Sequence, residues 1–169
     1  MARRSCAGSS KARELAGVDA KHLLETGNAV AAILVDQNGH YLLQLRDELP
    51  NIWYPGHWGF FGGSVDEGED ESEALRRELR EELELEFAQS LLFTRFEFDL
   101  RPLGLDRYFR AYYQIPISTA ALTELVLHEG AEMRIVSGDE ALVMKLVPYD
   151  GFALFLHHQR GRLIAQKST

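Results

Sequence analysis

Carboxylate side chains are concentrated in one short stretch of this sequence. Residues 66–86 hold 11 of the chain's 26 acidic residues and 3 of its 18 basic residues, which leaves 15 acidic and 15 basic residues elsewhere. The net charge of -8 therefore lies entirely in this stretch. Because carboxylate oxygens are the ligands that Mg²⁺ and Mn²⁺ prefer, the first chemistry to consider here is binding of a divalent cation.

A helix over residues 70–83 would organise these carboxylates. The 3.6-residue period places Glu78, Glu81 and Glu82 on one face, beside an apolar stripe of leucines at every fourth position from 75 to 83. Like charges at such spacing destabilise a helix by roughly 0.2–0.5 kcal/mol per pair, and a bound cation would remove that repulsion. The alternative is a solvated acidic surface helix, which is the usual meaning of a charge run.

The spacing of the motif favours the cation. Gly63 is followed after five residues by Glu69, after seven more by Arg77-Glu78-Leu79, and after one more by Glu81-Glu82. This order resembles the Nudix box of the Nudix hydrolases, G-x5-E-x7-R-E-U-x-E-E-x-G-U, in which U is aliphatic. The resemblance implies an α/β/α sandwich with a mixed β-sheet.

One position departs from the family pattern. Glu84 stands where the family has glycine, a residue that ends a helix with a left-handed backbone. We expect Glu84 to continue or fray the helix, so the change affects the helix exit rather than the ligands.

The resemblance also implies roles for the residues of the box. Glu78, Glu81 and Glu82 would bind Mg²⁺ or Mn²⁺ together with the backbone carbonyl of Gly63, and Glu81 would serve as ligand or catalytic base. Glu69 and Arg77 would support the loop and helix through an ion pair.

A further acid from outside the box is expected to complete the site. Glu129 is our candidate, because Gly130 beside it permits a turn toward the helix. Glu132 is the alternative.

The remaining candidates are less specific. Basic side chains that could contact a diphosphate are scattered, and the sequence does not choose among Arg46, Arg95, Arg107 and Arg110. Trp53 and Tyr54 could stack on a nucleobase, whereas Trp58 is expected in the core. The histidines are expected to be ordinary polar or capping residues, including His57, His128, His157 and His158.

Around the box, the sequence predicts mixed strands and two main helices. Residues 28–35 and 41–46 should form a hairpin around Asp36-Gln37-Asn38-Gly39. Further strands are expected over 58–61, over 89–100 and 108–117 as a long hairpin, and as another pair within 125–136 around Gly130. A short helix over 138–146 and a last helix from Pro148 should follow.

The chain as a whole is expected to be one catalytic domain. Residues 26–169 would form the Nudix domain, after a partly disordered extension over 1–25 in which residues 12–25 could be helical. Cys6, the single cysteine, excludes an internal disulfide, and it is badly placed for the catalytic cysteine of isoprenoid diphosphate isomerases. We expect a cytoplasmic protein that binds a nucleotide-derived small molecule, contacts neither nucleic acid nor membrane, and could form a homodimer.

Three functions are consistent with these features. The first is a Mg²⁺-dependent hydrolase that cleaves the phosphoanhydride of a nucleoside diphosphate linked to another group, such as a nucleotide sugar. The second is a nucleoside triphosphate pyrophosphohydrolase. The third is a Nudix-fold ligand-binding module without turnover, which the intact set of box glutamates disfavours.

Overall fold

The structure is a computed structural model that describes residues 26–165. The helix expected over residues 12–25, and the extension of which it would be part, lie outside the described residues. In the described residues no helix is long and apolar enough to cross a membrane.

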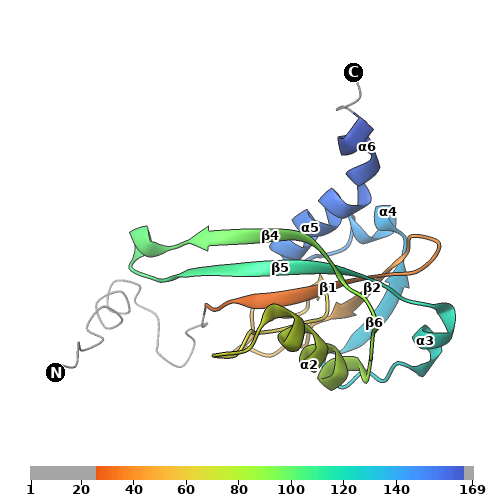
Figure 1. Cartoon of the computed structure of the whole chain (residues 1–169), viewed down its shortest axis with the longest axis horizontal. Helices are drawn as coiled ribbons and strands as arrows, with labels where there is room; N and C mark the ends of the chain where they lie inside the picture. The colour runs from red at the N-terminus through yellow and green to blue at the C-terminus, as the bar shows by residue number, and fades with distance from the viewer. Residues whose placement is uncertain (1–25, 166–169) are drawn as a thin grey trace.

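Six strands of the described chain form one mixed sheet (Figure 1). The strands are β1 (Ala29–Val35), β2 (Tyr41–Leu45), β3 (Trp58–Gly59), β4 (Leu91–Asp99), β5 (Arg107–Pro116) and β6 (Glu132–Val136). Their order is β3-β2-β1-β5-β4, and β6 pairs with β2. β1 runs parallel to β5, with Ala29 opposite Arg110, and the other pairs are antiparallel.

Helices cover both faces of the sheet, with α2 on one side and α5 on the other (Figure 1). The helical elements are α2 (Glu71–Leu83), η2 (Arg101–Leu103), α3 (Thr119–Glu124), α4 (Gly138–Ala141), α5 (Pro148–His158) and α6 (Arg160–Ala165). This arrangement confirms the expected α/β/α sandwich.

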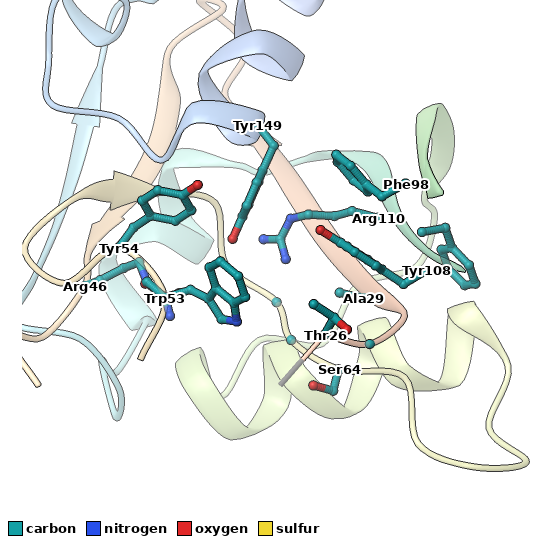
Figure 2. A pocket seen from close by; sticks show the side chains of 14 residues that line it. Thr26, Ala29, Arg46, Trp53, Tyr54, Ser64, Phe98, Tyr108, Arg110 and Tyr149 are labelled. Atoms are coloured by element: carbon teal, nitrogen blue, oxygen red, sulfur yellow. The ribbon is translucent and has the colours of Figure 1, made fainter. Parts of the chain in front are cut away.

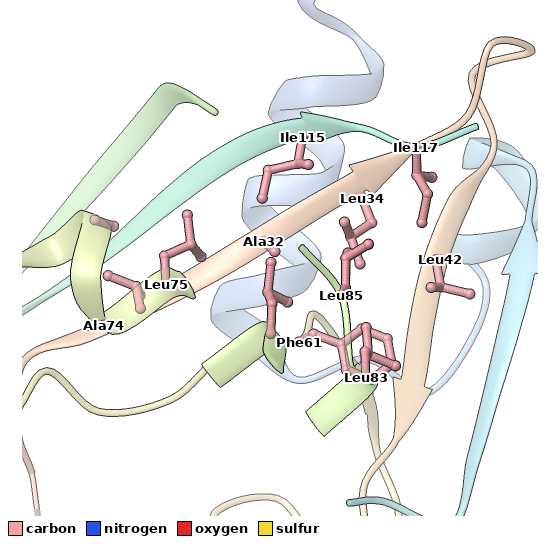
Figure 3. Close-up of a cluster of buried hydrophobic side chains, with 13 residues drawn as sticks. Ala32, Leu34, Leu42, Phe61, Ala74, Leu75, Leu83, Leu85, Ile115 and Ile117 are labelled. Carbon is pink, nitrogen blue, oxygen red and sulfur yellow. The ribbon is translucent and has the colours of Figure 1, made fainter. Parts of the chain in front are cut away.

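Alternate residues of β1 supply the two halves of the core. Ala32 and Leu34 pack against Leu75 and Leu83 of α2 on one face (Figure 3). Ile33 packs on the other face, where α5 contributes side chains. Because β1 is buried on both faces, it reads as a continuous apolar run rather than as an alternating one.

The two predicted hairpins are present. The turn between β1 and β2 is held by Asp36, whose carboxylate accepts hydrogen bonds from the N–H groups of Asn38 and His40 at 2.8 Å each. β4 and β5 pair along their length and are joined through η2. The helix expected over 138–146 is shorter than predicted, since α4 ends at Ala141.

The strand pair expected within residues 125–136 is wrong. This region contains only β6, and the segment before it runs along the end of α2, where the N–H groups of Val126 and His128 donate to the carbonyls of Leu83 and Glu82. The last carbonyls of a helix have no partner within the helix. They therefore accept hydrogen bonds from the N–H groups of this segment, which a second strand would have donated to a neighbouring strand. This segment leads directly to Glu129.

Candidate active site

α2 is anchored so that its acidic face turns toward the Gly62-Gly63 turn. Asp70 caps the helix by accepting hydrogen bonds from the N–H groups of Ser72 and Glu73 at 2.8 Å each, and the Glu73 carboxylate accepts from the Asp70 N–H. The predicted leucine stripe is fully buried: Leu75, Leu79 and Leu83. Burial of this stripe fixes the rotation of the helix about its axis.

Glu82 is the most buried of the box glutamates, with 5% of its surface exposed. Its carboxylate accepts hydrogen bonds from the Gly62 N–H at 2.7 Å and from Gln44 Nε2 at 3.4 Å. Burial raises its pKa to about 8, opposed by the Gly62 N–H and reinforced by repulsion from Glu78 and Glu129. In the described part of the chain no basic side chain pairs with Glu82, so a bound cation would favour its charged form.

Glu78 lies against Gly63. A Cβ atom at position 63 would lie 2.5 Å from the Glu78 carboxylate, so any other residue there would displace that carboxylate. Burial raises the pKa of Glu78, and Arg77, which donates to Glu78 Oε1 at 2.8 Å, opposes this shift. The glycine of the motif therefore leaves room for the Glu78 carboxylate against the turn.

The backbone carbonyl of Gly63, which the resemblance implies as a metal ligand, already accepts a hydrogen bond from the Val30 N–H at 2.9 Å. A carbonyl oxygen has two lone pairs, and one is left for a cation.

Arg77 joins the loop before α2 to the helix. Its guanidinium donates to both carboxylate oxygens of Glu69 at 2.9 Å each and to the Ser64 carbonyl at 2.9 Å. The ion pair that the resemblance implies is thus present as a two-point contact, which is geometrically more specific than a single bond. It fixes the loop that carries Gly63.

Glu81 is the exposed member of the set. Its side chain is 58% exposed and lies 3.4 Å from Arg77 Nη1. Within residues 26–165 no three histidine, cysteine or acidic side chains converge closely enough to hold a metal ion, since Glu78 and Glu81 instead bond to Arg77. The donor set nevertheless fits a hard divalent cation, because the partly desolvated, mutually repelling carboxylates of Glu78 and Glu82 both lie against the Gly62-Gly63 turn.

The structure separates the two candidates for the further acid. Glu129 lies close enough to the acidic face to raise the pKa of both Glu78 and Glu82 by repulsion. Glu132 instead accepts two hydrogen bonds from Arg134 of its own strand, at 2.7 and 3.1 Å. Of the two, Glu129 is the one beside the acidic face.

The expectation for Glu84 is wrong. This residue neither extends nor frays the helix; it ends α2 in the left-handed conformation, with φ 55° and ψ 25°. The N–H of Leu85 then bonds to the Leu79 carbonyl at 3.1 Å, a closing turn that requires a left-handed residue whatever its type. The Glu84 carboxylate contacts His128 Nε2 at 2.7 Å, in the segment that leads to Glu129.

An aromatic cleft of about 310 Å³ adjoins the acidic face (Figure 2). Its lining includes the Gly62-Gly63 turn and Trp53 and Tyr54, the two aromatics left open by the sequence. Trp58 is in the core, as expected. Because the cleft and the carboxylates share the glycine turn, one ligand can contact both.

Sequence reasoning missed much of this cleft. Tyr108, Tyr149 and Phe98 line it, and so do two members of the scattered basic set, Arg46 and Arg110. Arg46 Nε donates to the Trp53 carbonyl at 2.8 Å, whereas the terminal nitrogens of Arg110 point into the cleft (Figure 2). Asp150, which holds Arg110, was also missed. The sequence feature that could have indicated Tyr149 and Asp150 is their position directly after Pro148, in the first turn of α5.

His157 is buried and structural. Its Nδ1 lies 2.9 Å from the Tyr41 hydroxyl and its Nε2 lies 2.8 Å from Gln114 Oε1. Burial lowers its pKa to about 4, so the ring is neutral in the fold near neutral pH.

A mixed sheet between two helical layers defines the class of protein: an α/β/α sandwich domain with an acidic helix beside an aromatic cleft. Comparison with known proteins identifies the family. A sequence model of the NUDIX domain matches residues 25–164. The chain therefore belongs to the NUDIX domain family.

Individual relatives agree with this assignment. The chain is 46% identical over 50 residues to the nucleoside triphosphatase NudI of Salmonella agona (strain SL483). The match covers 30% of this chain and 35% of that relative, so it spans about a third of the relative's length.

Solved structures match over more of the chain. The E. coli ORF135 protein is 27% identical, with 81% of this chain and 92% of that chain covered and a TM-score of 0.62. The MutT protein of Methanosarcina mazei Go1 is 23% identical, with 83% and 99% covered and a TM-score of 0.63, and this likeness shows the fold.

Proposed function

We propose that this protein hydrolyses a phosphoanhydride bond of a nucleoside diphosphate linked to a further group, with Mg²⁺ or Mn²⁺ as cofactor. The observation that carries the proposal is that the aromatic cleft and the acidic face share one turn of the backbone. Gly62 and Gly63 line the aromatic cleft, and the same turn contacts Glu82 and Glu78. A nucleoside in the cleft would extend its phosphates across this turn to the carboxylates.

The acidic face supplies ligands for the cation. Glu78 and Glu82 would hold it, with Glu81, Glu129 and the Gly63 carbonyl as further oxygen donors. When bound, a divalent cation neutralises phosphate oxygens and lowers the pKa of a coordinated water toward neutrality. Without it, a phosphate chain would meet several negative charges, so binding of substrate and cation should be coupled.

The protein's own groups position these ligands. The Gly62 N–H orients Glu82, and Arg77 orients Glu78 and the loop through Glu69. Glu81 and Glu129 are the proposed catalytic carboxylates, either of which would take the proton of the attacking water. Glu81 is solvent-accessible and can turn from Arg77 toward substrate.

Two substrate classes are consistent with this site. A nucleotide sugar and a nucleoside triphosphate both contain a nucleoside diphosphate linked to a further group. The similarity to NudI, whose name describes it as a nucleoside triphosphatase, favours triphosphates for the first test.

The test is a hydrolysis screen. Purified protein with Mg²⁺ or Mn²⁺ is incubated with nucleoside triphosphates, nucleotide sugars and dinucleotides, and the nucleotide products are measured by anion-exchange chromatography. We expect turnover of at least one class, abolished by EDTA and restored by the metal. Absence of turnover across the panel, with folded protein and both metals, would contradict the proposal and favour the ligand-binding module.

A further inference from the structure

Arg110 occupies an unusual position within the aromatic cleft. It comes from β5, and its side chain is 12% exposed. Nε donates to Asp150 Oδ1 at 3.1 Å, and the guanidinium lies 4.8 Å from the centre of the Tyr149 ring. Figure 2 shows its terminal nitrogens pointing into the cleft between Tyr149 and Tyr108.

Asp150 compensates the charge of Arg110. It is 3% exposed, and besides Arg110 it accepts hydrogen bonds from the Phe60 N–H at 3.1 Å and the Tyr112 hydroxyl at 3.0 Å. The carboxylate is therefore fixed by three hydrogen bonds. With the positive charge offset, this part of the cleft offers directed N–H donors rather than a strong attraction for phosphate.

Aromatic rings flank these donors on both sides. Tyr149 and Tyr54 pack edge to face at 5.6 Å, and Phe98 stacks on Tyr108 at 4.8 Å between ring centres. The two pairs lie on opposite sides of Arg110 (Figure 2). A planar ring can stack between such aromatic walls while its edge faces the guanidinium.

The chemistry of the guanidinium limits which edge fits. Arginine has donors and no acceptor, so it can bond to a ring carbonyl or ring nitrogen but not to an exocyclic amino group, which also donates. An amino group at that place would leave N–H facing N–H in a site largely removed from water. Paired acceptors on a base suit arginine best, because its planar fork bonds to both.

We propose that Arg110 reads a carbonyl oxygen of the nucleobase, so that the enzyme prefers keto bases over the amino bases of the same ring size. This inference rests on the proposed function and names the nucleoside that the cleft accepts. Uracil, thymine, hypoxanthine and guanine would be favoured, while adenine and cytosine would be disfavoured.

Matched pairs of substrates test this directly. ITP and ATP differ at position 6 of the purine by a keto or an amino group, and UTP and CTP differ in the same way at position 4 of the pyrimidine. With Mg²⁺ and the full chain, we expect kcat/KM to favour the keto member by about tenfold or more in at least one pair, and the amino member in neither. Equal values within both pairs, or a preference for the amino member, would overturn the inference and leave the hydrolase proposal intact.

A variant pair assigns the preference to Arg110. Arg110→Lys keeps a positive charge beside Asp150 but removes the planar fork, so the keto preference should fall toward unity, mainly through KM. Arg107→Lys is the control on the same strand, because Arg107 is exposed and outside the cleft lining, and its keto preference should equal that of the wild type. A preference unchanged in Arg110→Lys would also overturn the inference.

Binding measurements separate the two proposals. If no triphosphate is hydrolysed, calorimetric titration of the same four nucleotides still compares keto with amino bases. Tighter binding of ITP than ATP, or of UTP than CTP, by about tenfold would support the role of Arg110 in a protein whose turnover is refuted. Equal affinities would refute it.

Discussion

At the scale of single residues, Glu82 is a carboxylate buried where a charge is costly. Burial raises its pKa to about 8, reinforced by repulsion from Glu78 and Glu129 and opposed by the Gly62 N–H. Because the ordinary pKa is 4.5, the folded state binds more protons than the unfolded state between these values. The metal-free protein should therefore lose stability as pH rises from about 4.5 to about 8.

Glu82→Gln should remove this loss. In EDTA, the difference in Tm between the variant and the wild type should increase from pH 5 to pH 8, and Glu81→Gln, at an exposed position, should show no such trend. With saturating Mg²⁺ the wild type should gain stability that Glu82→Gln lacks, and turnover of the variant should fall by about a hundredfold or more. A variant with near-normal kcat/KM would remove Glu82 from the cation site.

At the scale of elements, the end of α2 is where this chain departs from its family. Glu84 holds a left-handed conformation that costs a residue with a Cβ roughly 1 kcal/mol compared with glycine. Its carboxylate also contacts His128 at the surface, an interaction that solvent screens. The strain should outweigh the contact.

Glu84→Gly should therefore raise Tm by a few degrees and leave the reaction unchanged. Glu84→Ala is the matched control, since it keeps the strain and loses the contact with His128, and it should be less stable than the wild type. Thermal unfolding of the three proteins measures both effects. A glycine variant less stable than the wild type would show that the contact with His128 outweighs the backbone strain, and loss of turnover at saturating Mg²⁺ would make Glu84 a ligand.

At the scale of the whole molecule, the fold brings together acids that are far apart in the sequence. The segment before Glu129 bonds to the last carbonyls of α2, and this places Glu129 near Glu78 and Glu82. Glu132 lies three residues later but is turned to Arg134. Glu129 and Glu132 carry the same charge at different positions, so substitutions at the two sites test the effect of position alone.

Glu129→Gln should lower kcat at saturating Mg²⁺ and substrate by about tenfold or more, because it removes an oxygen donor or a base beside the acidic face. Glu132→Gln should change kcat less than twofold. Steady-state kinetics of both variants decide between them. Small and equal effects would place both carboxylates outside the reaction, and a larger effect at Glu132 would reverse the assignment.

The sequence by itself determined the box helix and most of the strands around it. The spacing from Gly63 to Glu82 predicted α2, its apolar and acidic faces and the family, because helical periodicity and motif spacing are local properties. The hairpin turn at Asp36 and the Pro at the start of α5 were local signals of the same kind.

Only the tertiary structure decided how distant parts meet. It brought two of four equivalent arginines, Arg46 and Arg110, to the cleft, and the register of β5 with β1 and the packing of Asp150 place Arg110 there. It replaced a predicted strand with a segment that satisfies the end of α2, and it gave Glu84 the conformation of the missing glycine. For Arg110 and for the segment before Glu129, the deciding hydrogen bonds join residues about 40 positions apart, so composition and spacing could not predict them. For Glu84 the deciding contact is local, but the residue type favours a helix and gives no sign of a left-handed end.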